Sequence, residues 1–276
     1  MEGSGRNLTE QMIINSLTDQ GEVIDWRLVA ENGLEDAFEN MLLSVPGEVS
    51  GVYGKVDIKS DNLNINNVDL TLLENSSCSN KDLYVYLSKQ SGTEAADLFL
   101  EKGVWSKDIP IPKNSEVLNA DGSINWSKAP EGGYELDLIG NAIKNEYIPA
   151  YGEVIDRYGS SNGRYVSPII DGVSFEYIER SLPYVEDYSN YHKYEVVGDF
   201  RNLEKYVRDC SDEDLKLKIE ALVDTYYNGN YNNLITYKGK VADVEGWGIG
   251  GAVQYEFPLS MEDLENLGLI KEIRDD

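Results

Sequence analysis

Along the first part of the chain, the spacing of hydrophobic residues is at first typical of helices and then typical of strands. Apolar residues recur every three or four positions over 8–17 and 23–43, which places them on one helical face. Alternation in twos then predicts short antiparallel strands over residues 52–58, 63–72 and 83–87. Thr93 and Gly103 supply a start and a stop signal for a further helix over 93–102.

The second half of the chain has the pattern of short strands. β-Branched and Tyr-rich runs separated by Gly or Pro predict strands over 153–157, 164–167, 173–177, 194–197, 234–237, 241–244 and 252–257. Two helices interrupt this pattern. One is highly charged and covers 203–227, and the other covers 260–267 and opens with Ser260 and an acidic first turn.

A stretch rich in Pro, Asn, Asp, Gly and Ser separates the two halves, between Trp105 and Pro130. Its composition is that of a domain boundary or a wrapping loop. We therefore expect an α+β protein in two parts. Residues 1–105 form an N-terminal region of helices and a small sheet, whose role the sequence does not reveal. Residues 106–276 form a compact C-terminal domain of mixed or antiparallel sheets with short helices.

The chain of 276 residues is strongly acidic, with 24 Lys and Arg against 50 Asp and Glu and a net charge of −26. Because nucleic acids and anionic membranes are bound by basic surfaces, this balance argues against both as partners. Hydrophobic residues make up 41% of the chain, so the acidity belongs to the surface of a folded protein. The sequence has no apolar run long enough to span a membrane. Residues 1–5 resemble a linker, and we expect a piece of a longer protein.

General catalytic motifs are missing from the sequence, which has no dinucleotide-binding glycine pattern, P-loop, zincin or hydrolase-elbow motif. Cys78 and Cys210 lie far apart without a CxxC or a neighbouring His pair, which predicts neither a zinc site nor a disulfide framework. The only histidine is His192, and no nucleophile motif accompanies it. We therefore expect no metal.

Four short motifs in the C-terminal half stand out by their order. They are Asp-Arg-Tyr-Gly at 156–159, Gly-Arg-Tyr-Val-Ser-Pro at 163–168, Arg-Ser-Leu-Pro at 180–183 and Gly-Gly-Ala-Val-Gln-Tyr at 250–255. The series resembles the tuberculosis necrotizing toxin family, whose members are NAD-cleaving glycohydrolases at the C-termini of secreted bacterial toxins. The resemblance implies that the chain hydrolyses NAD, and also NADP, to nicotinamide and ADP-ribose. NAD is then the substrate, and no cofactor is needed.

The resemblance also assigns roles to individual residues. Arg157 and Arg180 match the two arginines that bind substrate in the family. Tyr165 matches its pocket aromatic residue, His192 its loop histidine and Gln254 its glutamine. Physical reasoning supports the role assigned to the two arginines. On so acidic a chain, a pyrophosphate binds only where guanidinium groups offset the repulsion and make bidentate contacts.

Further residues are expected around this site. Arg164 would add to a locally basic mouth and bind substrate, while Gly250 and Gly251 would let the backbone approach the ligand closely. Nicotinamide leaves as a neutral molecule, so the reaction requires neither a general acid nor a glycosidase pair of carboxylates. Gln254 can orient a ribose hydroxyl or the attacking water, and Tyr165 can stack on a ring.

Each residue also has a simpler interpretation, because Arg157 at a strand end could be a surface ion-pair partner, and Tyr165 is one of 19 tyrosines. Two other functions stay open. An ADP-ribosyltransferase would cut the same bond and pass the sugar to an acceptor, but no clear Glu-x-Glu precedes a strand end. A non-catalytic acidic binding module would bind without reaction.

A toxin that drains NAD endangers the cell that makes it. We therefore expect a protein inhibitor, an immunity factor, as a partner. We also expect the chain to be secreted or delivered as an effector that acts in the cytosol of a target cell.

Overall fold

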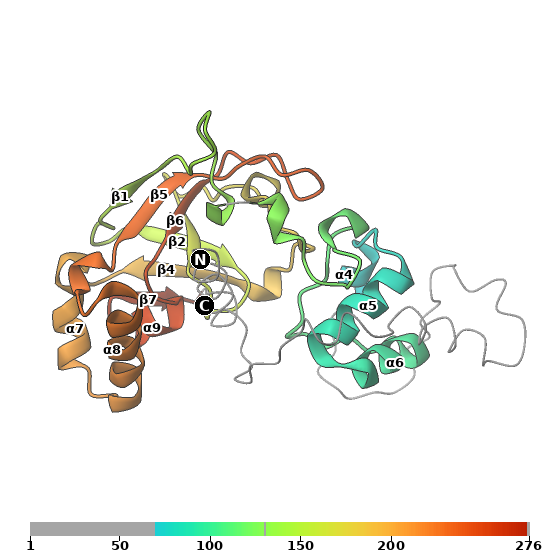
Figure 1. The fold of residues 1–276 in the computed structure, drawn as a ribbon, viewed down its shortest axis with the longest axis horizontal. Helices are drawn as coiled ribbons and strands as arrows, with labels where there is room; N and C mark the ends of the chain where they lie inside the picture. The colour runs from blue at the N-terminus through green and yellow to red at the C-terminus, as the bar shows by residue number, and fades with distance from the viewer. Residues whose placement is uncertain (1–69, 130, 275–276) are drawn as a thin grey trace, which may run out of the picture. The chain divides into compact units, whose positions relative to one another are not determined.

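The computed structural model describes residues 70–129 and 131–274, and Figure 1 shows its fold. The elements predicted over 8–17, 23–43 and 52–58 lie outside the described residues. The chain divides into two compact units. The described part of the first is Ser79–Val104 with Ala120–Gly122, and the second takes in the described residues of Asn66–Cys78, Trp105–Asn119 and Ser123–Asp276. The division into 1–105 and 106–276 stays a prediction.

The first unit contains two helices that pack against each other, α5 (Asn80–Ser91) and α6 (Thr93–Lys102). Helix α6 has the predicted bounds, and Gly103 ends it in a left-handed conformation with φ 67°. The strand predicted over 83–87 is wrong, because these residues lie inside α5. Ser79 Oγ accepts from the Asp82 N–H, and the Asp82 carboxylate accepts from the Ser79 N–H. This capping box satisfies donors at the helix start and outweighs the alternating pattern.

The second unit is built on a seven-stranded antiparallel sheet with the order β1-β5-β6-β3-β2-β4-β7. The strands are β1 (Lys144–Tyr147), β2 (Val154–Tyr158), β3 (Tyr165–Pro168), β4 (Tyr191–Val196), β5 (Thr236–Lys240), β6 (Val253–Glu256) and β7 (Ile270–Ile273). Together with the helices of the described chain they make the fold α+β, as predicted. The strands β2 to β6 overlap the segments predicted over 153–157, 164–167, 194–197, 234–237 and 252–257.

Some predicted strands are wrong. The segments 173–177 and 241–244 form loops that carry only isolated bridges, such as Ile170 with Val173 and Val244 with Gly248. These two bridges close tight turns of the chain on itself, and a third joins Val241 to the distant Tyr134, so neither segment pairs as a strand of the sheet. The described end of the strand predicted over 63–72 is helical, because Leu70–Glu74 forms α4.

The long helix predicted over 203–227 is two helices, α7 (Leu203–Asp209) and α8 (Glu213–Tyr227). The break comes at Asp212, whose carboxylate accepts from the backbone N–H groups of Asp214 and Leu215 and so caps α8. The prediction for the last helix is confirmed by α9 (Met261–Asn266), which Ser260 caps through the Asp263 N–H.

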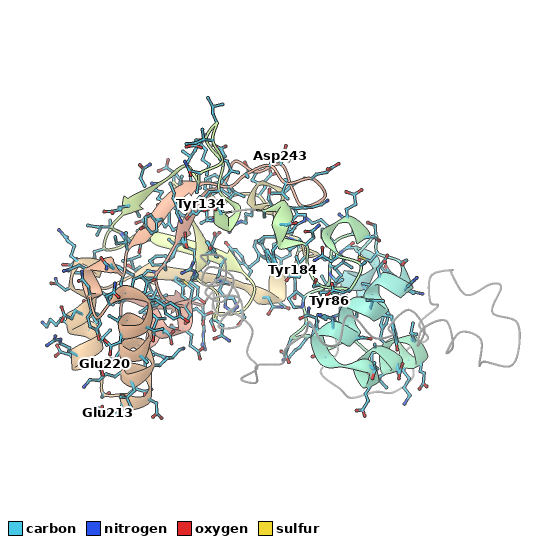
Figure 2. The ribbon with its side chains drawn as sticks, in the orientation of Figure 1. Tyr86, Tyr134, Tyr184, Glu213, Glu220 and Asp243 are labelled. Atoms are coloured by element: carbon cyan, nitrogen blue, oxygen red, sulfur yellow. The ribbon has the colours of Figure 1, made fainter. Side chains whose placement is uncertain are left out.

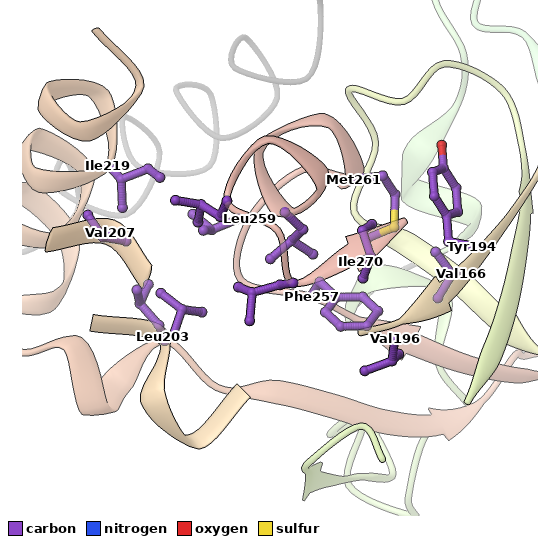
Figure 3. Packing of buried hydrophobic residues seen from close by; sticks show 14 of the residues in the cluster. Val166, Tyr194, Val196, Leu203, Val207, Ile219, Phe257, Leu259, Met261 and Ile270 are labelled. Atoms are coloured by element: carbon purple, nitrogen blue, oxygen red, sulfur yellow. The ribbon is translucent and has the colours of Figure 1, made fainter. Parts of the chain in front are cut away.

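Helices α7, α8 and α9 pack on one face of the sheet, which we call the helix face (Figure 1). Strand residues Ile155, Val166 and Tyr194 belong to the apolar cluster that these helices form with the sheet. Figure 3 shows Val166 and Tyr194 within it. Positions that alternate with these lie on the opposite face, among them Asp156, Tyr165, Gln254 and Glu256.

We call this opposite side the loop face, because irregular segments pack over it. The 3-10 turn η4 (Tyr177–Arg180) reaches it through Arg180, and the loop before β6 bonds to the same turn through the Ile249 and Ala252 N–H groups. Among the described residues, no helix is both long enough and apolar enough to cross a membrane.

Candidate active site

The strand register decides which of the predicted site residues share a face. Tyr165 of β3 pairs with Glu256 of β6, so Gln254, two residues before Glu256, points to the same side as Tyr165. Arg157 and His192 pair with each other across β2 and β4, at positions that alternate with Asp156. The structure therefore brings Tyr165 and Gln254 together on the loop face and places Arg157 and His192 on the helix face.

Gln254 is held at one end by the backbone. Its Nε2 donates to the carbonyl of Gly132 at 3.0 Å, and its side chain is half-buried. Beside it lies Tyr134, which is fully buried and labelled in Figure 2. Burial raises the pKa of Tyr134, and the nearby Glu256 carboxylate adds to the rise, whereas the amide of Gln254 opposes it.

The ring of Tyr134 lies where a side chain at position 239 would otherwise stand. A Cβ on Gly239 would come within 2.7 Å of this ring, so the glycine makes room for it between the Lys144 and Gln254 strand positions. The Gln254 amide is the polar group beside the Tyr134 hydroxyl, although no hydrogen bond of good geometry joins them among the described residues. Gln254 thus stands next to a buried donor.

Tyr165 and Arg164 belong to a charged cluster beside Gln254. Arg164 Nη2 lies 2.5 Å from one Glu256 carboxylate oxygen, and Lys144 Nζ lies 2.7 Å from the other. The Arg164 guanidinium carbon is 5.5 Å from the centre of the Tyr165 ring. Burial, together with the Glu256 carboxylate, raises the pKa of the Tyr165 hydroxyl. The hydroxyl is therefore protonated at neutral pH and can donate a hydrogen bond.

Arg180 is a buried residue with a carboxylate partner. Its Nη2 lies 2.7 Å from Asp156 Oδ1, and its Nε donates to the Phe175 carbonyl. Asp156 has no exposed surface and also accepts from the Tyr191 hydroxyl at 2.7 Å. The guanidinium lies over the ring of Tyr158, 5.4 Å from its centre. The positive charge of Arg180 is thus already balanced within the protein.

Arg157 is bound differently, because backbone carbonyls take the place of a carboxylate. Its Nε donates to the Gly159 carbonyl and its Nη1 to the Tyr165 carbonyl, at 3.3 and 3.1 Å. A Cβ on Gly163 would fall 2.1 Å from Nη2, so the guanidinium packs directly on that glycine. Burial lowers the pKa of Arg157 to about 10, at which the side chain is still charged at neutral pH.

His192 lies at the margin of the helix face. Its Nδ1 is 2.7 Å from Glu272 Oε1 of β7, and its ring stacks against Tyr194. This hydrogen bond, followed by a second one from Arg274, lowers the pKa of Glu272. The structure does not bring His192 near Gln254, because the two residues lie on opposite faces and on strands β4 and β6, which β2 and β3 separate in the sheet.

The two glycines before β6 differ in what they allow. Gly250 is buried with φ 67°, and a Cβ there would overlap the backbone of Ala242. Gly251, with φ 98°, is exposed, and a Cβ there would meet no described atom within 4 Å. At Gly250 the missing side chain makes room for the protein's own backbone. A ligand could approach the backbone at Gly251 but not at Gly250.

Two further observations concern metal ligands and cavities among the described residues. No group of three His, Cys, Asp or Glu side chains in this part of the chain could hold a metal ion. A cavity of about 600 Å³ is lined by the ends of α7, α8 and α9, including Tyr206, Cys210 and Leu267, and by none of the predicted site residues.

Sequence reasoning missed four residues of the loop face: Tyr134, Lys144, Asp156 and Glu256. Asp156 stands inside the Asp-Arg-Tyr-Gly motif and Glu256 follows the Gln-Tyr pair, so both were adjacent to recognised residues. Alternation along β2 and β6 places them on the face of Tyr165 and Gln254, which a strand register could have indicated. Tyr134 and Lys144 lie far from the motifs in sequence and carry no such signal.

Residues 150–211 match the family model described as tuberculosis necrotizing toxin. The resemblance inferred from the motifs is confirmed for this segment of the C-terminal region, which contains Arg157, Tyr165, Arg180 and His192 but not Gln254. No curated protein matches the chain.

A solved structure of tuberculosis necrotizing toxin complexed with its immunity factor is similar at a TM-score of 0.34 and 17% identity. The similarity covers 56% of this chain and 65% of that one, so the chain spans less than two thirds of the length of the toxin in that structure.

Proposed function

We propose that this chain, in which residues 150–211 carry a segment of the tuberculosis necrotizing toxin family, is the NAD glycohydrolase part of a toxin. The family match carries the proposal, because four of the five residues that the resemblance assigns fall inside it in the family's order. Gln254 lies outside the match, and its place beside Tyr165 on the loop face supports its inclusion. The reaction is hydrolysis of the bond between nicotinamide and ribose, in NAD and in NADP.

The geometry suggests a division of labour among these residues. Gln254, oriented by the Gly132 carbonyl, holds a ribose hydroxyl or the attacking water, since an amide both donates and accepts. Tyr165 lines the same face, the Arg164 guanidinium lies beside its ring, and the two meet the nicotinamide ribose and the adjoining phosphate. The task of the site is to hold the reacting ribose and water in place, since nicotinamide leaves without protonation.

The two arginines differ in what they can offer the substrate. Arg157 has a charge that no carboxylate within the described chain neutralises, but it lies on the helix face, opposite Tyr165 and Gln254, so its assignment to a phosphate rests on the family resemblance. Arg180 is buried and paired with Asp156, and its role is to shape the wall of the site. His192 on β4 pairs with Arg157 on β2, and its role is to help position Arg157.

Product analysis of the purified chain tests the proposal. Incubation with NAD should release nicotinamide and free ADP-ribose in equal amounts, both measured by chromatography, and no metal should be required. Label that stays on an added protein or nucleic acid would indicate an ADP-ribosyltransferase instead. No nicotinamide release at all would leave the non-catalytic binding module as the answer.

A protein inhibitor belongs to the same proposal. A cell that makes an NAD-destroying enzyme needs protection before the enzyme is delivered to its target cell, where NAD in the cytosol is the substrate. A protein that occupies the loop face over Tyr165 and Gln254 would abolish nicotinamide release in a one-to-one mixture. Binding without inhibition would place it elsewhere on the chain.

A further inference from the structure

Glu256 is a buried carboxylate with a cation on each oxygen. Its residue exposure is 8%, Arg164 Nη2 lies 2.5 Å from Oε1, and Lys144 Nζ lies 2.7 Å from Oε2. The two cations come from different elements, because Arg164 directly precedes β3 while Lys144 opens β1 at the edge of the sheet. Two positive charges and one negative charge leave this cluster at +1 on a chain whose net charge is −26.

Both cations are also fixed by aromatic rings. The Arg164 guanidinium lies over Tyr165, and Lys144 Nζ lies 5.0 Å from the ring centre of Tyr134 and 4.6 Å from that of Tyr237. A long side chain that is held by a carboxylate and a ring at once loses most of its rotamer freedom. Arg164 and Lys144 therefore present their charges in defined positions.

The cluster retains hydrogen-bonding capacity that the protein does not use. Arg164 Nε is buried and lacks a hydrogen-bond partner within the described residues, and the buried Tyr134 hydroxyl has only the Gln254 amide beside it, without a hydrogen bond of good geometry. Buried donors are normally paired, and those that are not call for a ligand or a water to complete them. Both groups belong to residues that adjoin Gln254 or Tyr165.

We propose that Glu256 is a positioning residue of the loop-face site, where it holds Arg164 and Lys144 as a fixed pair of cations for the phosphates of the substrate. The inference rests on the proposed glycohydrolase function. Glu256 itself does not touch substrate, since both of its oxygens are occupied by cations. Its charge lets two cations stand close together, which they would not do alone because like charges repel.

The variant Glu256→Gln tests this role, because it keeps the shape of the side chain and removes its charge. The cluster then rises from +1 to +2, Arg164 and Lys144 repel each other, and their alignment is lost. We expect kcat to fall about tenfold or more, since misplacing groups near a reacting centre has large effects on rate. KM should stay level or decrease, because the added positive charge favours an anionic substrate, and it should become more sensitive to salt.

Glu146→Gln is the matched control. Glu146 is an exposed carboxylate on β1 that points to the same face, and its replacement changes the net charge of the chain by the same amount. We expect its kcat and KM to equal those of the wild-type chain. If Glu256 only stabilises the fold, Glu256→Gln will lower the folded fraction but leave kcat per folded molecule and KM unchanged, and that result would overturn the proposal.

A second variant covers the case in which Glu256→Gln does not fold. Lys144→Met leaves the Arg164–Glu256 pair intact and lowers the cluster from +1 to zero, at a residue on the edge strand. We expect KM for NAD to rise several-fold, and an unchanged KM would exclude Lys144 as a phosphate contact and overturn the proposal. Nicotinamide release by the wild-type chain is measured first. Its absence refutes the proposed function, whereas wild-type activity with unaffected variants refutes only the role of Glu256.

Discussion

The two faces of the sheet bury their side chains in different ways. On the helix face, apolar strand residues such as Ile155 and Tyr194 meet α7, α8 and α9, and the polar residues Arg157 and His192 lie toward its margin. On the loop face, the carboxylates of Asp156 and Glu256 are both buried, and each is paired with one or two cations.

This difference supports the proposal that the site lies on the loop face. Buried ion pairs contribute little net stability, because desolvation offsets most of their attraction, while packed apolar residues contribute directly. The helix face is therefore what holds the unit together. A loop face with two buried carboxylates, their cations and several tyrosines has the composition of a binding site, where charge is placed at a cost to stability.

The largest expected effect on stability comes from breaking the pair on the loop face. Arg180→Ala leaves Asp156 buried without its cation, and we expect the free energy of unfolding to fall by about 3–5 kcal/mol. Arg208→Ala, which removes an exposed pair with Glu204, should cost about 0.5 kcal/mol or less. Urea unfolding of both variants measures the contrast. Equal losses would mean that the Arg180 pair is no more important than a surface one.

The largest expected effect on activity without loss of stability comes from Gln254→Ala. Among the described residues its side chain donates to the Gly132 carbonyl, so its loss should change the free energy of unfolding by about 1 kcal/mol. NAD cleavage should fall about 100-fold or more, mainly in kcat, as for other groups that act on a transition state. Gln90→Ala, at an exposed position of α5, is the control. Wild-type turnover in folded Gln254→Ala would remove Gln254 from the site.

Arg157 can be displaced without changing its charge. In Gly163→Ala the new Cβ would fall 2.1 Å from Arg157 Nη2 and push the guanidinium from its place between the Gly159 and Tyr165 carbonyls. We expect a stability loss of about 1–2 kcal/mol from the two weakened hydrogen bonds and about a tenfold lower kcat/KM for NAD. Ser161→Ala in the same loop should have neither effect. Full activity in folded Gly163→Ala would make Arg157 a clamp for the loop alone.

The sequence predicted strands well where apolar residues alternate against a core and poorly where local hydrogen bonds compete. Segments 153–157 and 252–257 were correct because their alternation reflects the helix face. Segment 83–87 alternates equally well, yet the Ser79 capping box made it helical. The edge strands β1 (KNEY) and β7 (IKEI) were missed, because their one or two apolar residues give no pattern.

The site was harder to predict than the strands, for a physical reason. Motif spacing names residues but not faces, and a face is set by register, which depends on pairing with distant strands. Arg157 and Arg180 looked equivalent in sequence, whereas pairing with Asp156 neutralises only Arg180. Lys144 and Tyr134 join the site only because β1 pairs with β5 and the segment before β1 folds over Gly239.

The smallest effect concerns His192 and its partner Glu272, and it disappears at acid pH. The hydrogen bond from His192, and then that from Arg274, lowers the pKa of Glu272 below the value of about 4.3 expected in an unfolded chain. A carboxyl group with a lowered folded pKa stabilises the fold above its unfolded pKa, and this contribution is lost as the pH falls through the folded value. In Glu272→Gln the contribution is absent at every pH. We therefore expect the wild-type chain to be more stable than the variant by about 1 kcal/mol or less at pH 6. This difference in stability should shrink as the pH falls below about 4.3.

Urea midpoints of both proteins from pH 3 to pH 7 measure this difference in stability. NAD cleavage at pH 7 measured on the same samples then separates two roles for His192 on the helix face. If the Glu272 pair only fixes the β4–β7 edge, activity will follow the folded fraction, whereas a drop in kcat per folded molecule would mean that the orientation of His192 beside Arg157 matters for the reaction.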